Sequence, residues 1–275
     1  ILSFVALFVC LFELVVPGAA LAPAISITMA FIYAFYLLKT GENRVTFTLN
    51  HFRFIPDIHQ QAIALGIPVF LSYTGFAMML FMVNIALVEV AGPDAQLLIS
   101  AHGILNRVFM LIFLPVIGMM IAFQTFAGFN YGARKNDRVI EVLKVALVAT
   151  AGYAAVWSTI MIFFSEYLFQ LFSTDQALID AATNISSIVF IGFITVGIAM
   201  ICPALFQAIG LAKPAAFLNA LHTYVLLLPA LVLYVMLFND YGAEGIWWLF
   251  PISDGITTII VGSYTWYFIN KLKLN

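Results

Sequence analysis

Charged residues are scarce in this sequence. Asp, Glu, Lys and Arg make up only 9% of its 275 residues, whereas 64% are hydrophobic. A soluble domain carries about 25% charged residues and cannot bury so much apolar surface, so we expect the chain in a membrane. Its net charge of −2, with no Lys/Arg run longer than two residues, excludes nucleic acid as a partner.

Motifs of membrane enzymes are also absent. The sequence holds no HExxH, no GxSxG and no glycine-rich phosphate loop, and its four histidines do not cluster at metal-ligand spacing. Cys10 and Cys202 both lie in apolar runs and predict no disulfide. We expect neither catalysis nor a bound cofactor. Because Ile1 opens inside an apolar run without an initiator Met, we expect the C-terminal part of a longer protein.

Long apolar runs dominate what is present. A helix needs about 20 apolar residues to cross the membrane, and these runs lack the alternation of barrel strands. The predicted fold is all-α, a polytopic transmembrane helix bundle of about eight spans. The expected spans are residues 1–15, 19–38, 63–88, 97–127, 140–164, 178–208, 214–238 and 245–269.

Charges in the connections alternate from one side to the other. The basic side carries Lys39, Arg44, Arg53, Arg134, Lys135, Arg138, Lys144, Lys213, Lys271 and Lys273. The acidic side carries Glu89, Asp94, Glu166, Asp175, Asp180, Asp240 and Glu244. One missed span would invert every later connection, so the alternation supports the count. The positive-inside rule then predicts a multi-pass protein of the inner or plasma membrane with a cytoplasmic C-terminus.

The connection 39–62 mixes apolar and polar residues at near-helical spacing. It is either an interfacial helix on the inner membrane surface or a plain solvated linker. Both interpretations make it the predicted boundary between segments 1–38 and 63–275.

Two charges, Arg107 and Asp254, lie well inside predicted spans. Each is about ten residues from the outward end of its helix, hence roughly 15 Å deep, so the two could pair. Either they form a fixed ion pair that orients two helices, or Asp254 senses a cation or proton during transport. His102 and His222 are interpreted as packing residues rather than proton carriers.

Four amides also lie inside spans. They either line a substrate path or make interhelical hydrogen bonds, which average about 0.6 kcal/mol in membranes. These residues are Gln124, Asn184, Gln207 and Asn219. Prolines without an amide hydrogen predict helix kinks at Pro68, Pro115, Pro203, Pro229 and Pro251.

The segment QTFAGFNYGARKNDRV at 124–139 strongly resembles the matching loop of the MATE multidrug and toxin extrusion transporters. Further matching pieces follow in order: GAALA at 18–22, LGIP at 65–68, LFSTD at 171–175, QAIGLAKPA at 207–215, GAEGIW at 242–247 and PISD at 251–254. The resemblance implies a twelve-helix, two-lobe antiporter. It makes 1–38 the last two helices of the N-terminal lobe, 39–62 a cytoplasmic linker and 63–275 the six-helix C-terminal lobe, with the missing N-terminal helices as partners.

This resemblance implies efflux of cationic or lipophilic drugs and toxic metabolites in exchange for Na⁺ or H⁺ by alternating access. Phe76 stands where the NorM-like branch has a Glu of its cation site, and no acidic residue occurs between Asp180 and Gly210. The chain therefore resembles the DinF/MepA-like branch, whose coupling carboxylate lies before Ile1.

Two alternatives remain. A lipid-linked glycan flippase of the same superfamily should hold several buried basic residues for a pyrophosphate, and only Arg107 qualifies. A non-transporting membrane scaffold or fragment is the other.

Overall fold

A computed structural model describes residues 15–40, 55–238 and 241–273. Over these ranges every regular element is helical and no strand occurs, which confirms the all-α prediction. Residues 1–14 of the predicted span 1–15 lie outside the described residues. So do residues 41–54 of the predicted linker, on which the interfacial-helix interpretation rests.

The described helices follow one another along the chain, and from α3 onward the connections between them are short. They are α2 (Val15–Thr40), α3 (Pro56–Ala91), α4 (Ala95–Gly132), α5 (Asn136–Phe163), α6 (Ser165–Phe169), α7 (Gln176–Phe193), α8 (Val196–Ala208), α9 (Ala212–Ala220), α10 (Leu228–Leu237) and α11 (Glu244–Lys273). A 3₁₀ turn, η3 (Gly92–Asp94), joins α3 to α4, and a π-helix, η4 (Leu221–Leu227), joins α9 to α10.

Most of these helices are long enough to cross a membrane. Six described stretches are long and apolar enough to cross a membrane, and one of them, Pro56–Gly132, contains both α3 and α4. The expected spans from residue 19 onward therefore each have a helical counterpart. The start of α3 at Pro56, rather than near residue 63, is the largest boundary difference.

The chain forms two compact units, Ile1–Pro56 and Asp57–Asn275. Within the first unit, α2 runs without interruption through Pro23. Its hydroxyls bond to the carbonyl one turn earlier, as in Ser26 to Ala22 at 2.7 Å and Thr28 to Ala24 at 2.7 Å. Such bonds satisfy polar side chains inside an apolar helix without needing a second helix.

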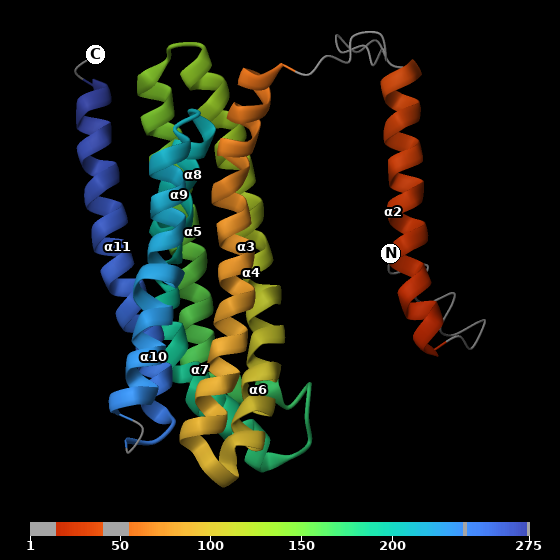
Figure 1. Cartoon of the computed structure of the whole chain (residues 1–275), viewed down its shortest axis with the longest axis vertical. Helices are drawn as coiled ribbons and strands as arrows, with labels where there is room; N and C mark the ends of the chain where they lie inside the picture. Colours follow the sequence, from red (N-terminus) through yellow and green to blue (C-terminus); the bar gives the residue numbers. More distant parts are fainter. Residues whose placement is uncertain (1–14, 41–54, 239–240, 274–275) are drawn as a thin grey trace. The chain divides into compact units, whose positions relative to one another are not determined.

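The second unit is a bundle in which α3 to α11 run roughly side by side (Figure 1). The α4–α5 turn, the α8–α9 junction and the end of α11 lie at one end of this bundle, and η3 with the α10–α11 connection lies at the other. Among the described residues of this unit, the predicted basic and acidic connections thus fall at opposite ends. The alternation of charge is a property of the folded bundle.

Aromatic packing holds the centre of the bundle together. Phe109 of α4 makes edge contacts with Phe190 and Phe193 of α7, with ring centroids 6.0 and 5.7 Å apart. Phe190 is fully buried, and it belongs to an apolar core that α3, α4, α5, α7, α10 and α11 all contribute to.

One interhelical hydrogen bond gives a small test of this packing. The fully buried Ser186 hydroxyl donates to the Met161 carbonyl at 2.9 Å, which links α7 to α5. We expect Ser186→Ala to lower the free energy of unfolding by about 0.6 kcal/mol, the average for such bonds in membranes. Ser187→Ala is the control, because the Ser187 hydroxyl bonds within its own helix to Asn184. Thermal unfolding of the purified protein in detergent measures the difference, and equal losses in both variants would contradict the expectation.

Two expected spans are not single regular helices. The span 178–208 is divided between α7, which ends at Phe193, and α8, which begins at Val196. The Thr195 amide and hydroxyl both donate to the Gly192 carbonyl, at 3.0 and 2.9 Å, and close a tight turn there. The span 214–238 contains the π-helix η4 between α9 and α10.

Candidate functional site

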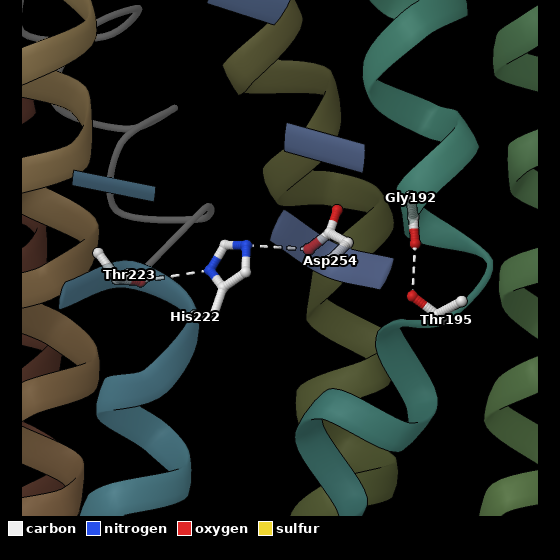
Figure 2. Close-up of polar contacts among 5 residues, drawn as sticks. All are labelled: Gly192, Thr195, His222, Thr223 and Asp254. Carbon is white, nitrogen blue, oxygen red and sulfur yellow. Dashed lines mark hydrogen bonds and ion pairs between the residues drawn. The ribbon is translucent and has the colours of Figure 1, made fainter. Parts of the chain in front are cut away.

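An ion pair joins η4 to α11. His222 Nε2 lies 2.9 Å from Asp254 Oδ1, although the ring N–H is not aligned as a well-formed hydrogen bond (Figure 2). The two side chains are 26% and 27% exposed. Charges inside spans are rare and usually functional, so this pair is the candidate site of the bundle.

The predicted pairing of Asp254 with Arg107 is wrong. The carboxylate of Asp254 faces His222, while Arg107 is exposed on α4 and makes no ion pair with any described residue. Equal depth in two helices does not bring two side chains together, because each must also point toward the other. His222, interpreted as a packing residue, is instead the partner of Asp254. His102 does pack, being buried with its ring centroid 5.4 Å from that of Trp247.

The π-helix places His222 at this position. A π-helix holds an extra residue per turn and is often found at functional sites. Here it ends just before Pro229, whose ring cannot donate to the carbonyl one turn earlier and crowds it. The widened turn relieves this conflict. His222 Nδ1 then lies 3.4 Å from the hydroxyl oxygen of its neighbour Thr223.

The helix break between α7 and α8 supports Asp254 from the other side. Asp254 packs so closely on Gly192 that a side chain at residue 192 would overlap its Oδ2 and carboxyl carbon. Gly192 is also the acceptor for Thr195 in the turn that ends α7 (Figure 2). Asp254 is therefore held between two stretches of irregular helix.

Helix α3 packs against η4 at the residues that follow His222. A Cβ on Gly75 would lie 3.0 Å from the ring of Tyr224 and 3.3 Å from Cβ of Thr223, so α3 runs directly against η4. By the family resemblance of the sequence, Phe76, the next residue, is expected where the NorM-like branch has a Glu. In this chain the carboxylate near η4 comes from α11 instead.

The four predicted amides occupy three different places. Gln124 Nε2 donates to Gln207 Oε1 at 2.8 Å and joins α4 to α8. Asn219 accepts from Ser72 at 3.3 Å and donates to the Ala215 carbonyl at 2.8 Å. These contacts fit the packing interpretation. Asn184 is exposed and lines a cavity of about 630 Å³ between α4, α7 and α11.

Because Gln124 and Gln207 share a hydrogen bond, we expect the stability losses of their substitutions to be strongly non-additive. Replacing either glutamine with Leu leaves a half-buried amide without its partner, which costs about 1–3 kcal/mol. Replacing both removes the two polar groups together, so the double variant should be more stable than the sum of the single losses. Unfolding of the three variants in detergent measures this, and strict additivity would contradict the bond.

The described residues contain no candidate metal site. Over residues 15–40, 55–238 and 241–273, no three acidic, histidine or cysteine side chains are placed to hold a metal ion. The site therefore consists of one acid and one base rather than a ligand cage.

Known proteins resemble this chain in sequence and in fold. The MatE family profile matches residues 68–233. The multidrug export protein MepA of Staphylococcus haemolyticus is 24% identical over 260 residues, which cover 94% of this chain and 56% of that protein. MepA of Staphylococcus aureus (strain bovine RF122 / ET3-1) is 25% identical over 255 residues, 90% of this chain and 53% of that protein. The chain thus spans about half the length of the curated relatives it matches.

Solved structures show the same fold. A MOP superfamily transporter from Pyrococcus furiosus superposes with a TM-score of 0.86 at 20% identity, over 98% of this chain and 59% of that one. A crystal structure of MATE in complex with MaL6 gives 0.86 at 20% identity, over 98% and 60%. The family resemblance expected from the sequence is confirmed, and the chain belongs to the MatE family of multi-pass membrane proteins.

Proposed function

We propose that the complete protein exports cationic or lipophilic drugs and toxic metabolites in exchange for Na⁺ or H⁺. The family and the MepA relatives, which are named multidrug export proteins, support this proposal. Residues 1–38 would end an N-terminal lobe, 39–62 would link the lobes in the cytoplasm, and 63–275 would form the C-terminal lobe. The two lobes would alternate access around a central cavity, as secondary transporters do.

The orientation of the protein follows from its charge distribution. The bundle end that carries the basic connections would face the cytoplasm, together with the C-terminus, in an inner or plasma membrane. Its partners would be small-molecule substrates, the lipid bilayer and the N-terminal helices of the same polypeptide. It would be a transporter and not an enzyme.

The His222–Asp254 pair carries the proposal of ion coupling. A His–Asp contact inside an apolar bundle loses hydration and contributes little net stability, so a purely structural role is a weak reason for its presence. It also lies between a π-helix and a helix break, and transporters bind coupling ions at interrupted helices. The carboxylate before Ile1, implied by the DinF/MepA resemblance, would act together with this pair.

Between the two coupling ions, the surroundings of Asp254 favour H⁺. One carboxylate oxygen already faces a basic ring nitrogen at 2.9 Å, and the other packs on Gly192. A proton moves between an imidazole and a carboxylate without a set of oxygen ligands. A bound Na⁺ would have to displace the imidazole first.

The flippase alternative has less support. A cavity for a pyrophosphate head group needs buried basic side chains, and Arg107 is exposed. Among the described residues, none of the buried side chains is a Lys or an Arg.

A vesicle assay of the complete protein tests the proposed function. The protein is reconstituted into liposomes, and ethidium efflux is followed under an imposed H⁺ gradient or an imposed Na⁺ gradient of the same size. We expect efflux under the H⁺ gradient and none above background under the Na⁺ gradient. Efflux under neither gradient would contradict the proposed transport function. Efflux under the Na⁺ gradient alone would contradict the assignment of H⁺ as the coupling ion.

A further inference from the structure

A cleft opens at the acidic end of the bundle, away from the His222–Asp254 pair. Its volume is about 630 Å³, and it lies between the first turns of α4 and α11 and residues 181–188 of α7. We call it the α4–α7–α11 cleft. Neither His222 nor Asp254 lines the cleft. Trp247 on its wall and Asp254 are two turns apart on α11, roughly 10 Å along the helix axis.

Aromatic side chains give the cleft a firm wall. Trp247 is only 3% exposed and is fixed between His102 and Phe250, with ring centroids 5.4 and 6.4 Å away. Trp248 beside it is 45% exposed and also lines the cleft. The face of an indole ring attracts cations more strongly than any other side-chain ring.

Polar groups on the lining carry no positive charge. The carboxylate of Glu244, the amide of Asn184 and the hydroxyl of Ser187 all line the cleft, and no Lys, Arg or His does. The connections at this end carry Glu89, Asp94, Glu166, Asp175, Asp180 and Glu244. The described Lys residues of this unit, and every described Arg except Arg107, lie toward the opposite end. The local potential is therefore negative and raises the concentration of cations at the cleft.

The size of the cleft limits what it would hold. Small-molecule sites typically occupy about 300–1,000 Å³, are mostly apolar and have few polar groups. A small hydrated metal ion would leave most of this space empty and would gain nothing from two indoles. An organic cation with an apolar body would use the indoles, the apolar lining and the carboxylate together.

We propose that the α4–α7–α11 cleft binds a lipophilic quaternary ammonium ion, with its charge between Glu244 and the exposed face of Trp248. Two sources have this chemistry: a free drug cation and the choline head group of a membrane lipid. If the protein exports cations, the cleft would lie on their exit route, and this step rests on the proposed function. Binding of the ammonium ion does not depend on that function.

Protection of an introduced cysteine from labelling tests binding at this one place. Ser187→Cys lines the cleft, and Ser263→Cys is exposed toward the far end of α11, so the second is the matched control. Both are made in the complete protein with its other cysteines replaced, in phosphatidylglycerol vesicles. The rate of labelling by a charged methanethiosulfonate is then measured in the presence of benzyltrimethylammonium, or of its neutral carbon isostere neopentylbenzene.

The proposal predicts that benzyltrimethylammonium slows labelling of Ser187→Cys about tenfold at saturation and leaves Ser263→Cys unchanged. The neutral isostere should protect weakly, because it lacks the charge. Adding Glu244→Gln or Trp248→Leu should weaken the affinity of the ammonium ion by about three- to tenfold, whereas Glu89→Gln and Trp266→Leu should not.

The lipid arm separates the two sources. Vesicles of phosphatidylcholine should protect Ser187→Cys without added ligand if a head group occupies the cleft, and should not if only free cations do. Both results support ammonium recognition. The proposal fails if the ion protects in neither lipid, if protection survives Glu244→Gln together with Trp248→Leu, or if the cysteine never reacts. Protection of Ser187→Cys without ethidium efflux would support the binding site and contradict the transport function. Efflux without protection would support the transport function and contradict the binding site.

Discussion

Gly192→Ala is expected to lower the free energy of unfolding by about 1–3 kcal/mol, because overpacking a filled site forces side chains and backbone to shift. The added methyl group would overlap the carboxylate of Asp254, which is itself held by His222. The carboxylate cannot move aside without leaving the imidazole. We therefore expect both a less stable protein and a displaced ion pair.

Two controls isolate the clash. Gly152→Ala, in the interior of α5 with open space around it, should be neutral or stabilise by about 0.5–1 kcal/mol, as Ala does in helices. Asp254→Ala on the Gly192→Ala background should recover part of the loss, because the methyl group then meets a small side chain. Thermal unfolding in detergent measures all three. A Gly192→Ala variant as stable as the parent would show that the carboxylate is not packed on α7.

Breaking the ion pair from one side should cost more than removing it entirely. In His222→Met the Asp254 carboxylate keeps its charge inside an apolar bundle and loses its partner. A fully buried pair loses about 3–5 kcal/mol in this way. Because these side chains are about a quarter exposed, we expect about 1–3 kcal/mol instead.

The double variant His222→Met with Asp254→Leu completes the cycle. It replaces both polar side chains with apolar groups of similar size, which is often neutral or stabilising. The double variant should therefore unfold at a higher temperature than His222→Met alone, in the same detergent. If it unfolds at a lower temperature, the pair stabilises the fold directly and the argument for a functional role is lost.

Much of the fold follows from apolar length and loop charge, because the membrane imposes both. Spans from residue 19 onward were predictable for this reason. Rotation about each helix axis was not, since lipid accepts apolar side chains all round and no amphipathic stripe marks the buried face. The spacing predicts one depth for Arg107 and Asp254, but it says nothing of the direction in which each side chain points.

Local irregularities were harder to predict. No proline marks the end of α7 in the sequence. The turn there is closed instead by the hydrogen bond from Thr195 to Gly192. The π-helix had a signal in Pro229, which predicts a disturbance one turn earlier without saying that it is a π-helix. That disturbance is what brings His222 to Asp254. Sequence reasoning therefore found the acid of the candidate site and missed the base.

The resemblance to the DinF/MepA-like branch implies no coupling carboxylate within residues 63–275, the predicted C-terminal lobe. The structure places one carboxylate of this unit, Asp254 of α11, against His222 of η4. Coupling by the C-terminal lobe can thus be proposed from the geometry of the pair.

Uphill efflux by Asp254→Asn tests this coupling most directly. The complete protein is reconstituted with Asp254→Asn or with Glu141→Gln, an exposed carboxylate on α5 that serves as the control. Ethidium movement is measured twice, against its gradient under an imposed pH gradient, and down its gradient without one. We expect Asp254→Asn to lose the uphill movement to the level of protein-free vesicles and to retain the downhill movement, with Glu141→Gln keeping both. Uphill efflux by Asp254→Asn at the rate of Glu141→Gln would contradict the assignment of proton coupling to the His222–Asp254 pair.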